Sequence, residues 1–179
     1  MSPAPAAQDP IEELSRGLTE ARDEFLRALR DVDPPLVATP GLVGEWSAQQ
    51  LLGHVGYWAG HAAEALHLAR EGRADELGAD EMDVDERNAV VARVAAESDL
   101  ATVRQRELIA FRALMEGLAG LERERLTDRV AYGDTIEQVI RDDGLDHYRE
   151  HTLDVRAWFS GDAPADQSED DAGPSADPG

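Results

Sequence analysis

The sequence contains no cysteine among its 179 residues. A disulfide framework, a thiolate zinc site and a cysteine nucleophile are therefore all excluded. Any thiol chemistry that this protein performs must use a thiol that is supplied from outside the chain.

Positive charge is also scarce, with 17 Lys and Arg against 38 Asp and Glu and a formal net charge of −21. Nucleic acids and anionic membranes attract cationic proteins and repel anionic ones. We therefore expect no nucleic-acid partner and no membrane partner. No apolar run approaches the roughly 20 residues that span a bilayer, and the first ten residues lack the features of a secretory signal. These absences predict a soluble, cytoplasmic protein.

The two ends of the chain have little that could be buried. Residues 161–179 carry six acidic side chains, no basic ones and no large apolar side chain. Such a segment cannot offset the entropy lost on ordering. We expect a flexible N-terminus over residues 1–9, one domain over residues 10–160, and a disordered acidic tail over residues 161–179.

Apolar residues recur at helical spacing only, which predicts an all-α protein with four helices. The first helix is expected to begin at Pro10 with Asp9 as its N-cap. The second begins after Ser47, which forms a capping box with Gln50, and ends near Gly72.

The third helical region covers about residues 84–121, and a second N-cap at Ser98-Asp99 could interrupt it. The fourth helix is expected to start at Asp134, with Glu137 as capping partner, and to end near Phe159. This order predicts an up-and-down four-helix bundle with a long second connection.

The histidines are the residues that indicate a metal site. His147 and His151 are four residues apart on an apolar stripe of the fourth helix, which is a spacing that lets two imidazoles share one metal ion. His54 lies on the core-facing stripe of the second helix and is the expected third ligand. His61 lies seven residues further on, about 10 Å along the helix axis, too far to share that ion. His67 is expected on the surface.

Other side chains near the histidines have expected supporting roles. Asp154 could accept the second N–H of a histidine ligand, as metal-bound imidazoles usually require. Gly144, one turn before His147, could leave room for a ligand. The aromatic rings expected to line the site are those of Tyr57, Trp58 and Tyr148.

These residues resemble the DinB superfamily, which includes thiol-dependent S-transferases and the metal-binding domain of mycothiol-dependent maleylpyruvate isomerase. The resemblance covers about residues 10–160. Its motifs are Trp46-Ser47 opening the second helix, LLGHVGYW around His54, Asn88, and DHYREHTLDVRAWF with His147 and His151. It implies a DinB-type four-helix bundle that binds a metal through His54, His147 and His151. The isomerase branch more often carries a carboxylate where His147 stands, which favours the general DinB branch.

Three imidazoles leave one coordination position open on a divalent ion, as in catalytic sites. Zinc is the first choice of metal, with nickel or iron as alternatives. By resemblance, the co-substrate is a low-molecular-weight thiol such as mycothiol or bacillithiol, which the metal would activate to attack a small electrophile in a detoxification reaction. The sequence leaves a homodimer open.

Two alternatives stay open at this stage. The first is a metal-dependent hydrolase in which the metal activates water and Glu150 or Tyr57 transfers a proton. The second is a non-enzymatic, stress-related module whose metal is structural.

Overall fold

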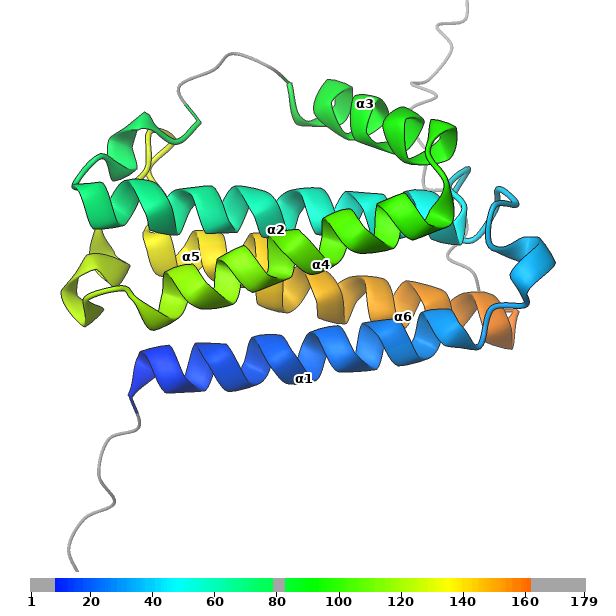
Figure 1. Ribbon diagram of the computed structural model, residues 1–179, viewed down its shortest axis with the longest axis horizontal. Coiled ribbons are helices and arrows are strands. Elements are labelled where there is room, and N and C mark those ends of the chain that lie inside the picture. The colour runs from blue at the N-terminus through cyan, green and yellow to red at the C-terminus, as the bar shows by residue number, and fades with distance from the viewer. Residues whose placement is uncertain (1–8, 79–82, 162–179) are drawn as a thin grey trace, which may run out of the picture.

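The computed structural model describes residues 9–78 and 83–161, which form a helical bundle without a β-strand (Figure 1). The all-α class is therefore confirmed. Apart from Asp9 and Gly161, the expected flexible N-terminus and acidic tail lie outside the described residues. None of the described helices is long and apolar enough to cross a membrane. The helices are α1 (Pro10–Arg30), α2 (Ala48–Glu71), α3 (Val84–Glu97), α4 (Leu100–Ala119), α5 (Ile136–Ile140) and α6 (Asp146–Ser160).

Local capping explains where the helices begin and end. The Asp9 side chain accepts from the backbone N–H of Ile11, and Ser47 and Gln50 form the predicted capping box of α2. Gly72 ends α2 in the left-handed conformation, with φ of 73°.

The start of α5 is a correction to the sequence prediction. Its N-cap is Thr135 rather than Asp134, and Thr135 forms a capping box with Gln138 rather than with Glu137. A π-helical turn over Arg141–Leu145 then joins α5 to α6. The fourth helix of the bundle is thus one helix with a π-turn inside it.

The chain reverses at the predicted interruption, because α3 ends at Ser98 and Asp99 caps α4. As a consequence α2 and α4 run parallel. A Cβ built on Gly60 would meet Ala110 at 3.7 Å, and one built on Gly117 would meet Leu66 at 3.1 Å. The predicted long second connection therefore contains α3, which carries the chain back along the bundle (Figure 1).

Helices α1 and α6 form the second parallel pair, antiparallel to the first. Gly17 faces Leu145 near one end of the pair, and Arg156 reaches Glu24 at 3.6 Å towards the other. The four-helix bundle thus consists of α1, α2, α4 and the α5–α6 unit, and α3 packs on α2.

A buried carboxylate joins the four helices of the bundle. Glu107 on α4 is only 2% exposed, and Arg22 on α1 donates to it from Nε at 2.7 Å and from a terminal nitrogen at 2.8 Å. The hydroxyl of Tyr148 on α6 donates to the same carboxylate at 2.7 Å. Gly56 on α2 allows this contact, because a Cβ there would lie 3.0 Å from the Glu107 Cα.

We predict that removing this carboxylate destabilises the fold far more than removing one of its hydrogen bonds. Glu107→Ala should lower the free energy of unfolding by about 3 to 5 kcal/mol, because Arg22 loses its buried counter-ion. Tyr148→Phe should cost about 1 to 2 kcal/mol. Urea unfolding measures both values, and Glu116→Ala on the exposed face of α4 is the control. Equal effects of Glu107→Ala and Glu116→Ala would contradict this role.

Candidate metal centre

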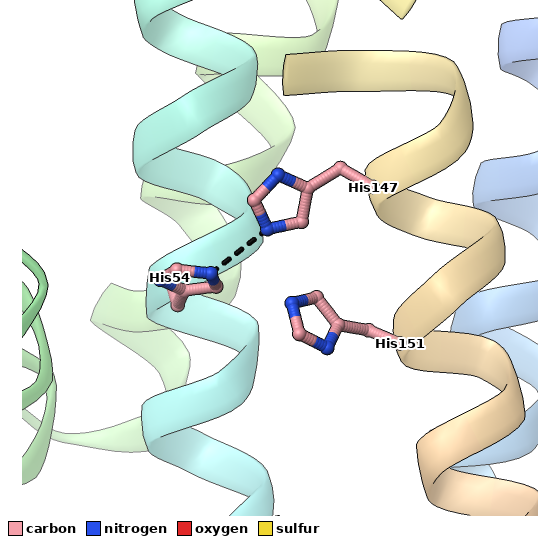
Figure 2. Close-up of side chains that lie close together, drawn as sticks. All are labelled: His54, His147 and His151. Carbon is pink, nitrogen blue, oxygen red and sulfur yellow. Dashed lines mark hydrogen bonds between the residues drawn. The ribbon is translucent and has the colours of Figure 1, made fainter. Parts of the chain in front are cut away.

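The structure brings the three predicted ligands together. His54 lies on α2, His147 and His151 lie on α6, and each offers a nitrogen within 4.8 Å of those of the other two. Figure 2 shows the rings converging from the two helices, with the Nε2 atoms of His54 and His147 2.8 Å apart. The i,i+4 spacing on α6 and the facing position on α2 are sufficient to build this cluster.

Burial keeps two of the imidazoles uncharged at neutral pH. Desolvation, and then the nearby His147 and His151, lower the pKa of His54 from 6.5 to about 3. Desolvation and His151 lower the pKa of His147 to about 4, although a hydrogen bond with the Asp142 backbone opposes this shift. Neutral imidazoles have a free lone pair, which is the form that binds a metal ion.

The three rings differ in the hydrogen bonds that hold them in place. His151 Nδ1 lies 2.8 Å from Asp154 Oδ2, as the sequence predicted, so its Nε2 is left for the cluster. His147 bonds to the backbone of Asp142 within the π-turn. His54 Nδ1 is buried and has no hydrogen-bond partner among the described residues.

The geometry fits a divalent metal ion. Nitrogens that bind one zinc ion at about 2.1 Å in tetrahedral geometry lie roughly 3.4 Å apart. This separation falls between the 2.8 Å of the closest pair and the 4.8 Å limit for the cluster. An ion among the three rings would also replace the contact between the His54 and His147 nitrogens. Small ring rotations would therefore complete a three-imidazole site.

The cluster opens into a cavity of about 590 Å³ between α2, α3 and the α5–α6 unit. Trp58 forms one wall, where its Nε1 donates to Asn88 Oδ1 at 3.0 Å. The ring of Trp46 packs against His54 with the centroids 4.7 Å apart. The charged side chains that line the cavity are Arg87, Asp134, Asp142, Asp143 and Glu150.

The two expected proton-transfer residues lie in different places. Glu150 lines the histidine cavity and is exposed to solvent. Tyr57 lines a separate cavity of about 390 Å³ under α3, and its hydroxyl accepts a hydrogen bond from Arg87 at 3.0 Å. The expectation that Tyr57 lines the metal cavity is wrong, because the residues that line it include Trp58, whose ring lies 5.4 Å from that of Tyr57, but not Tyr57 itself.

Two further expectations need correction. Tyr148 does not line the cavity, since it is fully buried and hydrogen-bonded to Glu107. Gly144 leaves no room for a ligand, because a Cβ there would lie 2.9 Å from the Leu18 side chain on α1. The missing side chain is needed for helix packing instead. His67 is exposed, as expected.

One pair in this cavity was missed by the sequence reasoning. His61 Nδ1 lies 2.7 Å from Asp143 Oδ2, and both residues line the cavity. A signal for Asp143 is present in the sequence, since Asp143, His147 and His151 follow one another at intervals of four residues.

Comparisons with known proteins show similarity in fold only. No protein-family model and no curated protein matches the chain. The colibactin self-resistance protein ClbS, crystallised with double-stranded DNA, matches with a TM-score of 0.69 and 13% identity, over 87% of this chain and 98% of that one.

Two further solved structures are similar. A protein from Streptococcus pneumoniae matches with a TM-score of 0.68 and 11% identity, over 86% of this chain and 92% of that one. An uncharacterised protein from Clostridium difficile 630 matches with a TM-score of 0.70 and 11% identity, over 86% of this chain and 98% of that one. At these identities the fold is shared, and membership of the DinB superfamily stays a prediction.

The similarity to ClbS corrects one expectation. We excluded a nucleic-acid partner from net charge, whereas a protein of this fold has been crystallised with double-stranded DNA. Net charge is a sum over the whole chain and does not describe any single surface, so that exclusion was wrong.

We predict that one divalent ion binds per chain through the three histidines. His54→Ala and His147→Ala should each remove most of the binding, because two imidazoles chelate weakly. Asp154→Asn should weaken binding by about 10-fold through loss of ring orientation. Isothermal titration with Zn²⁺, Ni²⁺ and Fe²⁺ measures the affinity, with His67→Ala as the control. Stoichiometric metal retained by a His147→Ala/His151→Ala protein would overturn the assignment.

The lowered pKa of His54 predicts acid sensitivity of the metal-free protein. Below pH 6.5 the unfolded chain takes up a proton at this residue, whereas the folded chain does so only near pH 3. Stability that is present above pH 6.5 is therefore lost as the pH falls towards 3. With a chelator present to remove metal, the free energy of unfolding should decrease as the pH is lowered. This decrease should be less steep in His54→Gln than in the wild type. Identical slopes would show that His54 is not protected from protonation.

Proposed function

We propose that this protein is a metal-dependent enzyme of DinB type that transfers a low-molecular-weight thiol to a small electrophile. The observation that carries the proposal is the cluster of three histidines open to one cavity. A site with three protein ligands keeps a position free for a reactant, which is typical of catalytic rather than structural metal sites.

The residues that would hold the metal are His54, His147 and His151, with zinc as the first choice and nickel or iron as alternatives. When bound, such an ion makes a thiol more acidic and so supplies a nucleophile at neutral pH. The absence of cysteine from the chain agrees with a thiol that comes from outside, such as mycothiol or bacillithiol.

The chain's own residues would orient the ligands and receive a proton. Asp154 holds the His151 ring so that Nε2 faces the cluster. Glu150 lines the cavity and is open to solvent, so its carboxylate could pass the proton released by the thiol to water. Trp58, fixed by Asn88, offers a flat apolar surface for the electrophile.

The charge of the cavity wall favours an uncharged or cationic electrophile. Four carboxylates, Asp134, Asp142, Asp143 and Glu150, line the cavity with one arginine, Arg87. Asp143 is paired with His61, and Arg87 with the Tyr57 hydroxyl. The remaining negative charge would repel an anionic substrate in a partly desolvated cavity.

The name of one structural neighbour supports a protective role. ClbS is a self-resistance protein against colibactin. A transferase that joins a cellular thiol to a reactive compound would serve the same general purpose in detoxification.

A hydrolase is the second candidate, because the same open position could hold water. Its general base would be Glu150, the expected proton-transfer residue that lines this cavity. This reaction would need no thiol, so thiol dependence separates the two candidates.

We predict that the zinc-loaded protein accelerates the conjugation of a small thiol to 1-chloro-2,4-dinitrobenzene or to N-ethylmaleimide. The rate should saturate with thiol concentration and should be lost in His147→Ala or in chelator. An anionic maleimide that carries a carboxylate should react more slowly than N-ethylmaleimide. Thioether formation is followed by absorbance and mass spectrometry, and His67→Ala should retain full activity.

Other outcomes would exclude the transferase. Hydrolysis without thiol, together with inhibition by added thiol, would indicate the hydrolase. If no thiol and electrophile give metal-dependent turnover while chelation still lowers the melting temperature, the metal has a structural role.

A further inference from the structure

A second polar pair lies in the histidine cavity, apart from the metal cluster. His61 on α2 and Asp143 in the π-turn are bonded through Nδ1 and Oδ2 at 2.7 Å, and their side chains are only 12% and 17% exposed. Neither belongs to the group of three histidines. A partly buried carboxylate and imidazole that both line a cavity form an arrangement suited to proton transfer.

The pairing determines which ring nitrogen can act. A carboxylate only accepts hydrogen bonds, so the neutral His61 ring donates through Nδ1 and keeps its lone pair on Nε2. Burial raises the pKa of Asp143, and the hydrogen bond from His61 opposes that shift. The other titratable groups that line the cavity are Tyr132, Asp134, Asp142, Glu150, Arg87 and the three histidines.

The position of the pair indicates what it would contact. Seven residues of α-helix separate His54 from His61, which is about 10 Å along the axis. The Trp58 ring lies between them, 6.4 Å from the His54 ring and 5.3 Å from the His61 ring. A molecule lying on Trp58 could therefore have one end at the metal cluster and the other at His61.

We propose that His61 is the proton donor to electrophiles whose reaction places negative charge on an oxygen, as addition to a conjugated carbonyl compound does, with Asp143 as its positioning residue. This inference rests on the proposed thiol transfer. The thiolate sulfur forms a bond to the β-carbon, and the C=C electron pair moves towards the carbonyl oxygen. His61 first takes up on Nε2, from water, the proton that the thiol released, and then gives it to that oxygen. The enol becomes the ketone in water, and the His61 ring is neutral again.

Two electrophiles separate this role from a structural one. Addition to methyl vinyl ketone places negative charge on an oxygen that needs a proton, whereas substitution on 1-chloro-2,4-dinitrobenzene releases chloride and needs none. In the zinc-loaded protein, His61→Asn should lower kcat/KM for the ketone by about 100-fold or more. The rate with the aryl chloride should change less than about threefold. Asn can keep the hydrogen bond to Asp143, so zinc content and melting temperature should be retained.

The same comparison tests the positioning residue. Asp143→Asn should lower the ketone rate and leave the aryl chloride rate unchanged, whereas His67→Asn should change neither. If His61→Asn lowers both rates equally, or lowers neither, the proton-donor role of His61 is overturned. Either result would leave the proposed thiol transfer standing.

A binding measurement tests the subsite without turnover. With a chelator present to remove metal, 4-nitrophenolate, whose oxygen resembles the enolate oxygen, should quench tryptophan fluorescence. Its Kd should be about 10-fold higher in His61→Asn and unchanged in His67→Asn. If the wild type turns over neither electrophile, thiol transfer is overturned. The donor role of His61 then stands only if nitrophenolate binding depends on His61, and equal affinities would overturn it.

Discussion

The buried carboxylate of Glu107 is the constraint on which the arrangement of the helices depends. It binds Arg22 on α1 and Tyr148 on α6, and it lies against Gly56 on α2. A buried charge is costly unless its partners are in place, so the three neighbouring helices can adopt few other registers. Tyr148 directly follows His147 along α6. The same contact that holds α6 in the core therefore also fixes the helix that carries two of the three clustered histidines.

The cavity chemistry follows from that placement. Once α6 faces α2, three imidazoles meet in a partly desolvated space, where burial disfavours the charged forms of His54 and His147. The π-turn before α6 adds to this geometry, because it contains Asp142, whose backbone bonds to His147, and Asp143, which bonds to His61. Irregular helical turns are frequent at functional sites, since they redirect side chains that a regular helix would place elsewhere. Here one π-turn supplies contacts to the histidine cluster, through Asp142, and to His61, through Asp143.

Much of this arrangement could be predicted from local sequence rules. The caps at Asp9 and Ser47 and the three inward histidines depend on helical spacing, which the sequence contains directly. Long-range features could not be read in this way. The parallel course of α2 and α4 depends on α3 folding back, and the packing of Gly144 on Leu18 depends on a neighbouring helix. Tyr57 was misplaced because it lies beside the inward stripe of α2 and faces α3 instead.

The central claim, that three imidazoles form a metal centre with a position open to a thiol, is tested most directly by X-ray absorption spectroscopy of the zinc-loaded protein. The account predicts a first shell of light atoms at about 2.0 to 2.1 Å with the multiple-scattering signature of three imidazoles. On addition of a small thiol, one sulfur should appear at about 2.3 Å. A shell of oxygen atoms without imidazole scattering would contradict the metal centre, and an imidazole shell that excludes sulfur at saturating thiol would contradict the open position.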